Sequence, residues 1–423
     1  MTRVTDLSVR GFKAIEEVDI QPGGVNLIVG RNNVGKTSLL EAMYLCLDPT
    51  SLRDFRGHLD KLIRDSSEFS TAEICVDYFV SDNSRGTRKS ENSSRRQLRV
   101  EAPDSEEIYT AFLNSVGQST EEHPDRSKIS EKTKELIVEA VEEALDRTTP
   151  KRIGRNCRNS YAAISVNEKN YGFFMSDDVW QTKRTIRQKS KRIFKQKFSN
   201  SRPEEKIEET YLDRFVHQIL KTHQTSDRGF IGESPPIVDG IRFIKTASVD
   251  GSNVDTSEEG AAIKRSDIEE FLVDNDIVEG LRDFSFDRLV FAEGEQKDEV
   301  PYDFMGSGFK TLVGILWELF DTDTEEDVVL IEEPAVHMHP GYVNEFTDQL
   351  LTLARQRDIQ LFLTTHREDL IESFFSPATE HAHGEYLSEE FQLVKMTEPL
   401  TTQLDYEQAQ AELEDVNADL RGI

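Results

Sequence analysis

The stretch GRNNVGKT at residues 30–37 restricts the possible folds of this chain more than any other feature of the sequence. It fits the pattern G-x-x-x-x-G-K-[ST] in full, between the apolar run VNLIV and the helical pattern TSLLEAMYLCL. Glycines at positions 30 and 35 allow the turn to direct several backbone N–H groups toward one anion at a helix N-terminus. The sequence therefore predicts a strand–loop–helix unit that holds phosphate, with Lys36 facing the β- and γ-phosphates.

The predicted nucleotide-binding set covers this loop and the residue after it, and the predicted cofactors are ATP and Mg²⁺. It comprises Gly30, Arg31, Asn32, Asn33, Val34, Gly35, Lys36, Thr37 and Ser38. The hydroxyl of Thr37 is the group in this set that suits Mg²⁺.

A second apolar run, DVVLIEEP at residues 327–334, ends in two carboxylates. Ligands of open α/β sheets bind outside the carboxyl ends of the strands, so we expect both carboxylates at the phosphate site. Glu332 is predicted to bind Mg²⁺, and Glu333 to act as general base toward an attacking water. His366 follows the next apolar strand, IQLFLTT, and is predicted to contact the γ-phosphate and to hold the water in place.

The segment FMGSGFKTLVGILWEL at residues 304–319 predicts a second helix whose N-terminus suits an anion. A chain with one phosphate loop does not need two phosphate sites for one nucleotide. We therefore predict a homodimer in which the Ser307 helix of each chain covers the nucleotide of the other. An ordinary N-cap at Ser307 is the alternative, because serine is common before helices.

The apolar runs at 25–29, 328–333 and 359–365 predict a parallel sheet covered on both faces, hence an α/β fold. Three segments are expected: residues 1–84 and 236–423 form two lobes of one head, and residues 85–235 form a basic, mostly helical insertion. Helical spacing occurs at 130–146 and 204–221, and the Ser/Arg-rich stretch 81–97 is expected to be a loop. The C-terminal lobe should end in a hairpin within 383–396 and a short acidic helix.

Charge is distributed unevenly along the chain. The whole sequence has 51 basic and 80 acidic residues, a net charge of −29, which excludes a uniformly basic DNA coat protein. Residues 85–230 nevertheless hold 29 basic against 23 acidic residues, a net charge of +6. Lys183–Lys197 contains eight cations and no acid, and Lys151–Arg158 adds four more cations. We expect these two clusters to contact the DNA backbone, which such clusters bind without sequence preference.

The alternative for this basic segment is a solvated helix face with a buried apolar side. Phe194 and Phe198 are candidates for stacking on bases, but Ile186, Ile193 and Phe194 more simply form one buried face. Three cysteines without a C-x-x-C pair, no apolar stretch of about 20 residues and no secretory N-terminal pattern predict a cytoplasmic protein.

Taken in order, the Gly30–Thr37 loop, the GSG helix, the EEP strand and the TTH strand resemble the ABC-type ATPase heads of the SMC/Rad50/RecF group. Within that group the OLD-like (AAA15/AAA21) ATPases are most similar, through the opening LSVRGFKAIEEVDIQPGGVNLIVGRNNVGKTSLLEAMYL and the stretch EEPAVHMHP. The resemblance covers about residues 1–80 and 236–375, and it implies a P-loop NTPase fold of the ABC-ATPase type.

By this resemblance Glu332 would serve Mg²⁺, Glu333 hydrolysis, and His366 would be the switch histidine. Ser307, Gly308 and Lys310 would act on the nucleotide of the partner chain, and His337 and His339 would lie at the dimer interface. The chain shows three departures: Ala335 stands in place of the family's glutamate, the signature reads GSGFK rather than the LSGGQ of transporters, and no clear Q-loop is present, with Gln97 as a candidate in a poor context.

The residues after His366 contain no D-x-D motif, so the TOPRIM nuclease domain of OLD nucleases is not expected here. The resemblance then implies an ATP-hydrolysing head in genome maintenance or anti-phage defence, with a separate nuclease as partner. Two alternatives remain open: a RecF/Rad50-like DNA-repair ATPase, and an ATP-gated assembly scaffold with negligible turnover.

Overall fold

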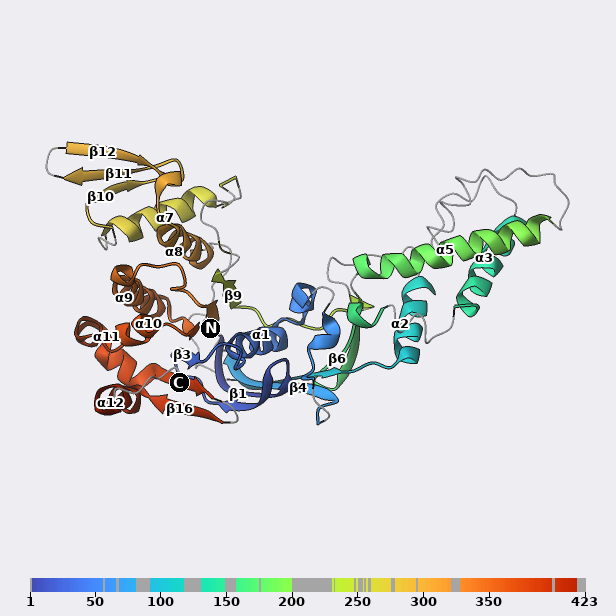
Figure 1. Ribbon diagram of the computed structural model, residues 1–423, viewed down its shortest axis with the longest axis horizontal. Coiled ribbons are helices and arrows are strands. Elements are labelled where there is room, and N and C mark those ends of the chain that lie inside the picture. The colour runs from blue at the N-terminus through green and yellow to red at the C-terminus, as the bar shows by residue number, and fades with distance from the viewer. Residues whose placement is uncertain are drawn as a thin grey trace. The chain divides into compact units, whose positions relative to one another are not determined.

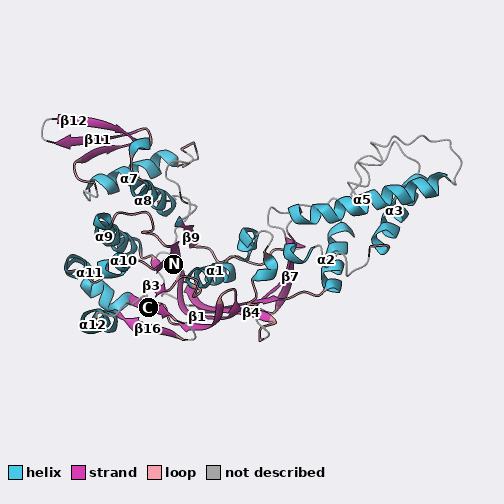
Figure 2. Cartoon of the chain, viewed as in Figure 1, coloured by secondary structure: helices cyan, strands magenta, loops and turns pink. Residues whose placement is uncertain are grey.

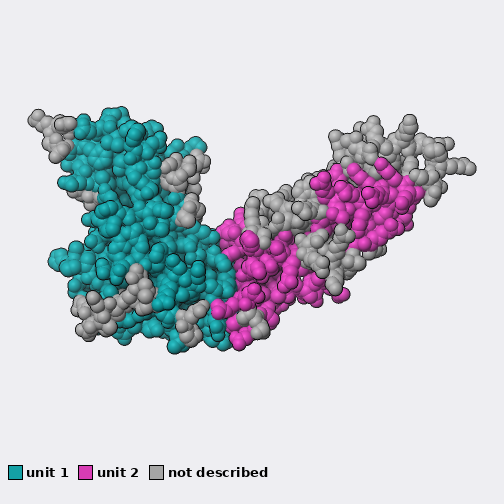
Figure 3. Space-filling view, in the orientation of Figure 1, with its two compact units in different colours: residues 1–47, 74–96, 238–423 teal, residues 48–73, 97–237 magenta. Residues whose placement is uncertain are grey.

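A computed structural model describes the protein over most of its length. The described residues are 2–55, 58–65, 68–80, 92–117, 131–148, 157–174, 176–199, 230–231, 233–246, 249, 254, 256–257, 260–274, 278–293, 296–320, 328–397 and 400–416. They form two compact units (Figure 3). The first consists of Met1–Leu47, Ile74–Arg96 and Val238–Ile423, and the second of Asp48–Glu73 and Gln97–Ile237.

A six-stranded sheet forms the centre of the first unit (Figure 1). Its order is β16 (Thr401–Asp405), β15 (Phe391–Met396), β3 (Val25–Gly30), β14 (Gln360–Thr365), β13 (Val328–Glu332) and β9 (Ile241–Lys245). All neighbours are parallel except β16, which runs antiparallel to β15. Every residue of β3 and β14 is buried, as the continuous apolar runs predicted for strands covered on both faces.

Seven helices, a three-stranded sheet and the first two strands of a seven-stranded sheet also belong to the first unit (Figure 2). The helices are α1 (Lys36–Leu47), α7 (Ala261–Asp274), α8 (Ser307–Leu319), α9 (Pro340–Arg357), α10 (Glu368–Ser373), α11 (Pro377–Glu390) and α12 (Tyr406–Val416), among the described residues. The strands are β1 (Thr2–Phe12) and β2 (Ile15–Ile20), which are antiparallel, and β10 (Leu281–Phe284), β11 (Arg288–Glu293) and β12 (Gln296–Pro301), which form an antiparallel sheet. A 3-10 turn, Tyr302–Phe304, precedes α8.

The order of strands in the six-stranded sheet determines where the predicted site residues meet. Helix α1 packs against β3, β9, β13 and β14. The register pairs Glu332 with Thr364 and with Lys245, so β13, β14 and β9 end at one edge of the sheet. Because parallel strands end together, the loop after β3 and the carboxylates after β13 share that edge.

The second unit combines helices with antiparallel strands. It holds α2 (Ser105–Gly117), α3 (Glu131–Asp146), α5 (Ser176–Ser199), β6 (Tyr161–Val166), β7 (Lys169–Phe174), β8 (Phe230–Ile231) and the 3-10 turns Pro49–Phe55, Leu59–Lys61 and Arg158–Ser160. The division between the units passes through β4 (Thr71–Val80) and β5 (Asn92–Glu101). Ile137, Val141, Ile186 and Phe194 belong to a core shared by α3 and α5, which confirms the buried apolar face predicted for this segment.

Several elements differ from the sequence prediction. The second unit starts before residue 85, because it includes Asp48–Glu73, whose turn Leu59–Lys61 packs against Arg158–Ser160. Strand β5 begins at Asn92, within the stretch predicted to be a loop, because pairing with neighbouring strands outweighs its polar composition. The β6–β7 hairpin was not predicted. The predicted helix 204–221 and the stretch 81–91 lie outside the described residues.

The predicted hairpin within 383–396 is also wrong in its first half. Residues up to Glu390 belong to α11, and only Phe391–Met396 form a strand, β15. The partner of β15 in a hairpin is the later strand β16, while its other edge pairs with β3. The acidic helix predicted after it is present as α12. No helix among the described residues is long and apolar enough to cross a membrane.

Candidate active site

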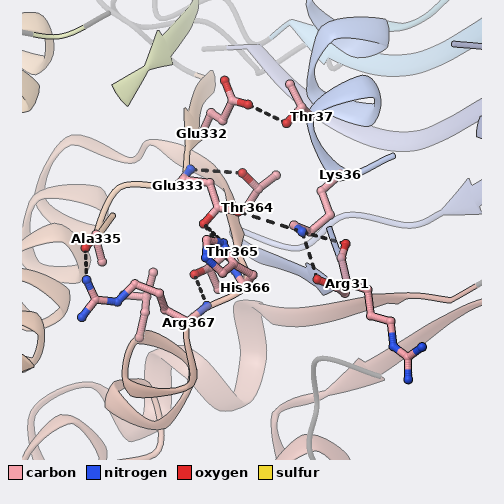
Figure 4. Close-up of polar contacts among 12 residues, drawn as sticks. Arg31, Lys36, Thr37, Glu332, Glu333, Ala335, Thr364, Thr365, His366 and Arg367 are labelled. Atoms are coloured by element: carbon pink, nitrogen blue, oxygen red, sulfur yellow. Dashed lines mark hydrogen bonds and ion pairs between the residues drawn. The ribbon is translucent and has the colours of Figure 1, made fainter. Parts of the chain in front are cut away.

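Residues from the loop after β3, from the end of β13 and from the end of β14 line one cavity of about 540 Å³ in the first unit. The lining residues are Ala14, Asn32, Asn33, Gly35, Lys36, Thr37, Ser38, Glu332, Glu333 and His366. Nine of these ten residues belong to the set predicted from the sequence, although they come from three separate segments. Figure 4 shows the polar contacts of five of them: Lys36, Thr37, Glu332, Glu333 and His366.

The backbone of the loop adopts the conformations that its residue types allow. Gly30 and Gly35 have φ angles of 153° and 103°, and Asn33 has a φ of 68°. Glycine reaches these angles without steric cost, and asparagine tolerates the left-handed region better than most residues. A Cβ at Gly35 would also lie 3.0 Å from Cγ1 of Ile15. The loop therefore needs glycine at position 35 for both conformation and space.

Lys36 is held inside the loop that precedes it. Its Nζ donates to the carbonyl oxygens of Gly30 at 2.9 Å and of Arg31 at 3.0 Å, and the residue is 6% exposed. Nζ lies 3.9 Å from Oε1 of Glu333. Burial lowers the pKa of the Lys36 ammonium, and the Glu333 carboxylate opposes that shift. The side chain is thus a cation placed in the cavity before any phosphate enters.

Thr37 and Glu332 place two hard oxygen ligands side by side. The hydroxyl of Thr37 donates to Oε1 of Glu332 at 2.5 Å. Among the described residues no group of three or more His, Cys, Asp or Glu side chains could hold a metal. This donor set fits Mg²⁺, which proteins commonly bind through one or two side chains with substrate phosphates and water completing the shell.

Glu333 has a left-handed backbone, with a φ of 49°. This conformation costs on the order of 1 kcal/mol for a residue with a side chain. The amide N–H of Glu333 donates to Thr364, whose carbonyl oxygen and Oγ1 each lie 3.1 Å away. Thr364 therefore holds the turn after β13 that brings the Glu333 carboxylate into the cavity.

His366 contacts the same carboxylate twice. Its backbone N–H donates to Oε2 of Glu333 at 3.3 Å, and its Nδ1 lies 2.9 Å from that oxygen. Nδ1 is buried and its contact with the carboxylate does not meet the geometry of a hydrogen bond. The side chain of His366 as a whole is 42% exposed, and the residue lines the cavity.

The remaining predicted residues do not line this cavity. Gly30 and Arg31 contribute carbonyl oxygens to Lys36, and Val34 packs beside Gly30. Ser307 is exposed at the start of α8, and Gly308 lies against His337 and Met338 of the same chain. Nζ of Lys310 donates to the carbonyl oxygen of Asp303 at 3.0 Å. His339 caps α9, where its Nδ1 accepts from the N–H of Gly341 at 3.1 Å.

Sequence reasoning missed Ala14, Thr364 and Arg367. Ala14 belongs to the turn between β1 and β2, whose residues approach Gly35. Thr364 carries no signal beyond its place two residues before His366. Arg367 contacts the segment after β13 through hydrogen bonds to the carbonyl oxygens of Ala335 and Met338. No local sequence pattern predicts this contact.

In the second unit, α5 places the basic residues of Lys183–Lys197 on different faces. Arg184, Arg192 and Lys195 are exposed. Lys197 instead pairs with Glu139 and Glu143 of α3 at 2.9 Å each, and Lys189 donates to Oγ1 of Thr148 at 2.8 Å. Phe194 is 4% exposed and belongs to the α3–α5 core, so the structure favours the buried helix face over stacking on bases for this residue.

Other parts of the predicted DNA contact lie beyond what the structure describes. The side chains of Lys183 and Phe198 and residues 151–156 fall outside the described part of the chain. Gln97, the candidate for the Q-loop, belongs to β5, where its side chain donates to Glu73.

Comparisons with known proteins extend this description. A family model described as AAA ATPase domain matches residues 3–371. The DNA replication and repair protein RecF of Shewanella amazonensis is 35% identical over 85 residues, which is 20% of this chain and 23% of that protein. RecF of Nitrosococcus oceani is 44% identical over 46 residues, 11% of this chain and 13% of that protein. The matches thus cover less than a quarter of these relatives.

Solved structures similar to this chain include two SMC head domains. The SMC head domain from Thermotoga maritima has a TM-score of 0.43 and 11% identity, and the match covers 95% of this chain and 98% of that one. An Smc head domain with an extended coiled coil, bound to the C-terminal domain of ScpA and derived from Pyrococcus furiosus, has a TM-score of 0.42 and 12% identity, with 99% and 100% coverage.

Proposed function

The chain belongs to the AAA ATPase domain family, and from that membership we propose that it is a Mg²⁺-dependent ATP-hydrolysing head that dimerises around nucleotide. One observation carries the proposal: Lys36, Glu333 and His366 meet in one cavity although three separate segments supply them. A cation for phosphate, a carboxylate for water and a histidine beside that carboxylate are groups that suit phosphoryl transfer to water.

Phosphate binding follows from the loop and from α1. The loop directs N–H groups toward the cavity at the positive end of the α1 helix dipole. Lys36 is already oriented by the carbonyls of Gly30 and Arg31, and a triphosphate would take over part of its hydrogen bonding. Binding then costs little reordering of the lysine side chain, because burial has already restricted it.

Glu333 is the group that takes a proton from the attacking water, and general-base catalysis of this kind contributes about 10²–10⁴-fold. His366 orients the Glu333 carboxylate through its backbone N–H and its ring. Thr37 and Glu332 would hold Mg²⁺, and the ion would supply charge neutralisation at the phosphate oxygens. The decisive measurement is steady-state ATP hydrolysis by the wild type and by Glu333→Gln.

A homodimer is the part of the proposal that explains Ser307. This residue opens α8 at the surface, away from the cavity that its own chain provides. In a dimer the exposed N-terminus of α8 would cover the nucleotide of the partner chain. Mixing a Lys36→Ala chain with a Ser307→Arg chain tests this, because neither parent dimer has an intact site whereas every mixed dimer would retain one. A mixture that recovers no activity contradicts a shared site.

The exposed basic residues of α5 favour DNA as a binding partner. Arg184, Arg192 and Lys195 are exposed there, which suits contact with a phosphate backbone. The similarity to RecF, named as a DNA replication and repair protein, points to the same partner. Duplex binding by the wild type and by Arg184→Ala/Arg192→Ala, measured over a salt series, tests the contact. A double variant with unchanged affinity and salt slope would rule out α5.

Two biological roles are compatible with the same ATPase chemistry. An OLD-like head in anti-phage defence would work with a separate nuclease, whereas a RecF/Rad50-like repair ATPase would not need one. Co-purification of a nuclease with the tagged chain distinguishes these versions. A third candidate, an ATP-gated scaffold, requires negligible turnover in the wild type and no further effect of Glu333→Gln on hydrolysis.

A further inference from the structure

Arg367 follows directly after His366 and makes contacts that neither phosphate binding nor hydrolysis uses. Its Nη1 donates to the carbonyl oxygens of Ala335 and of Met338, the latter at 2.9 Å. Its backbone N–H donates to Oγ1 of Thr365 at 3.0 Å. The side chain is 19% exposed, so these contacts lie mostly out of water.

Asp369 holds the guanidinium of Arg367 in this orientation. Nε of Arg367 donates to Oδ1 of Asp369 at 2.9 Å, and Nη2 donates to Oδ2, which makes the pair bidentate. The pair raises the pKa of Arg367 and lowers that of Asp369, in both cases first through the hydrogen bond between them. Both groups therefore stay ionised at neutral pH, and the remaining donor, Nη1, is free to point at backbone carbonyls.

The carbonyls that Nη1 reaches belong to a turn that continues from Glu333. The N–H of Val336 donates to the carbonyl oxygen of Glu333 at 3.1 Å, and the N–H of Met338 donates to that of Ala335 at 2.9 Å. Ala335 and Met338 are buried. Arg367 thus fastens the segment after the general base to the segment that carries His366 (Figure 4).

The same turn also contacts the N-terminus of α8. A Cβ placed on Gly308 would lie 2.7 Å from the carbonyl oxygen of His337 and 3.1 Å from Cα of Met338. Only a glycine permits this approach, since both neighbouring atoms are backbone. Gly306, two residues earlier, has nothing within 4 Å of such a Cβ. The position of Ser307 is therefore set in part by the turn that Arg367 holds.

We infer that Arg367 is a positioning residue that couples His366 and Glu333 to the N-terminus of α8 within one chain, through the segment Ala335–Met338. This coupling rests on the proposed function, because it would transmit the presence or absence of a γ-phosphate beside His366 and Glu333 to the N-terminus of α8 at Ser307. A change at His366 moves Arg367, Arg367 moves the Ala335 and Met338 carbonyls, and the turn moves Gly308.

Hydrogen–deuterium exchange of the full chain without nucleotide tests the coupling directly. Arg367→Ala should speed exchange in two places, residues 335–339 and residues 307–311, and Arg367→Lys should restore part of the protection. Gly308→Ala should disturb the same two places with Arg367 intact. Arg355→Ala, at an exposed arginine of α9, is the control and should leave both segments as in the wild type.

Kinetics provide the second readout. With Mg·ATP, Arg367→Ala should lower kcat about tenfold while the Kd for Mg·ATP stays within about twofold, because the phosphate loop is untouched. Faster exchange confined to 335–339, unchanged exchange in both segments, or a Kd that rises in step with the loss of kcat overturns the inference. A wild type that hydrolyses no ATP refutes the proposed function instead, and the exchange pattern still decides the coupling.

Discussion

Oε2 of Glu333 receives both nitrogen contacts from His366: the backbone N–H lies 3.3 Å away and Nδ1 lies 2.9 Å away. The histidine thus approaches the oxygen that would accept the proton of a water. The backbone of Glu333 is left-handed, with a φ of 49°. The two residues form one unit whose parts come from the ends of two adjacent strands, β13 and β14.

The effects of substituting Glu333 and His366 on kcat should not be additive. Glu333→Gln removes the general base and should lower kcat about 10²–10⁴-fold with ATP binding retained. His366→Ala should lower kcat by a smaller factor, because it disturbs the orientation of the carboxylate. The double variant should be no slower than Glu333→Gln, which steady-state hydrolysis measures. Fully multiplied losses would mean that His366 acts independently of Glu333.

ATP affinity should depend on pH through Lys36. Burial lowers the pKa of its ammonium, so the neutral amine forms at a lower pH than for an ordinary lysine. The neutral amine does not attract phosphate, and the Kd for ATP should therefore rise as the pH increases through this range. Lys36→Arg keeps its charge and should show a weaker affinity with a flat alkaline profile. An equal alkaline loss in both proteins would assign the titration to another group.

The Mg²⁺ requirement should respond to the hydroxyl of Thr37, which contacts Glu332 at 2.5 Å. Thr37→Ala removes one oxygen ligand and should raise the Mg²⁺ concentration for half-maximal ATP hydrolysis about tenfold or more. Thr37→Ser keeps the hydroxyl and serves as the control. Identical Mg²⁺ titration curves for the alanine variant and the wild type would contradict a role of Thr37 at the metal.

Stability of the second unit should depend on Ile186, which is 0% exposed in the α3–α5 core. Ile186→Ala should lower the free energy of unfolding by about 2–5 kcal/mol, through lost burial and the cavity left behind. Gln188→Ala changes an exposed position of the same helix and should have an effect below about 0.5 kcal/mol. Denaturant titration followed by circular dichroism measures both. Equal effects would show that α5 is not packed as described.

Most of the nucleotide site could be predicted from the sequence. The glycine pattern of residues 30–37, the two carboxylates after an apolar strand and a histidine after the next one each carry a local signal. Parallel strands end at one edge of their sheet, so these signals imply proximity without coordinates. The same reasoning does not reach Ala14, because a turn between two strands of another sheet has no pattern that points to the phosphate loop.

Other errors arose where tertiary pairing outweighs local composition. The stretch before Gln97 looked like a loop because it is rich in serine and arginine, yet β5 begins at Asn92. Residues up to Glu390 looked like a strand of a hairpin, yet they close α11, and β15 starts only at Phe391. For β5 the pairing with strands distant in the chain decides the outcome, whereas at α11 the helix continues to Glu390 and pairing with β3 begins only at Phe391.

The phosphate-loop pattern, the α/β class and the choice of Lys36, Glu333 and His366 as candidate groups come from the sequence alone. These features depend on residue type and short spacing, which a linear pattern contains. The left-handed turn at Glu333 and the contacts of Arg367 with Ala335 and Met338 emerge only in the folded chain. Those depend on hydrogen bonds between segments about thirty residues apart, whose geometry exists only after β13 and β14 have paired.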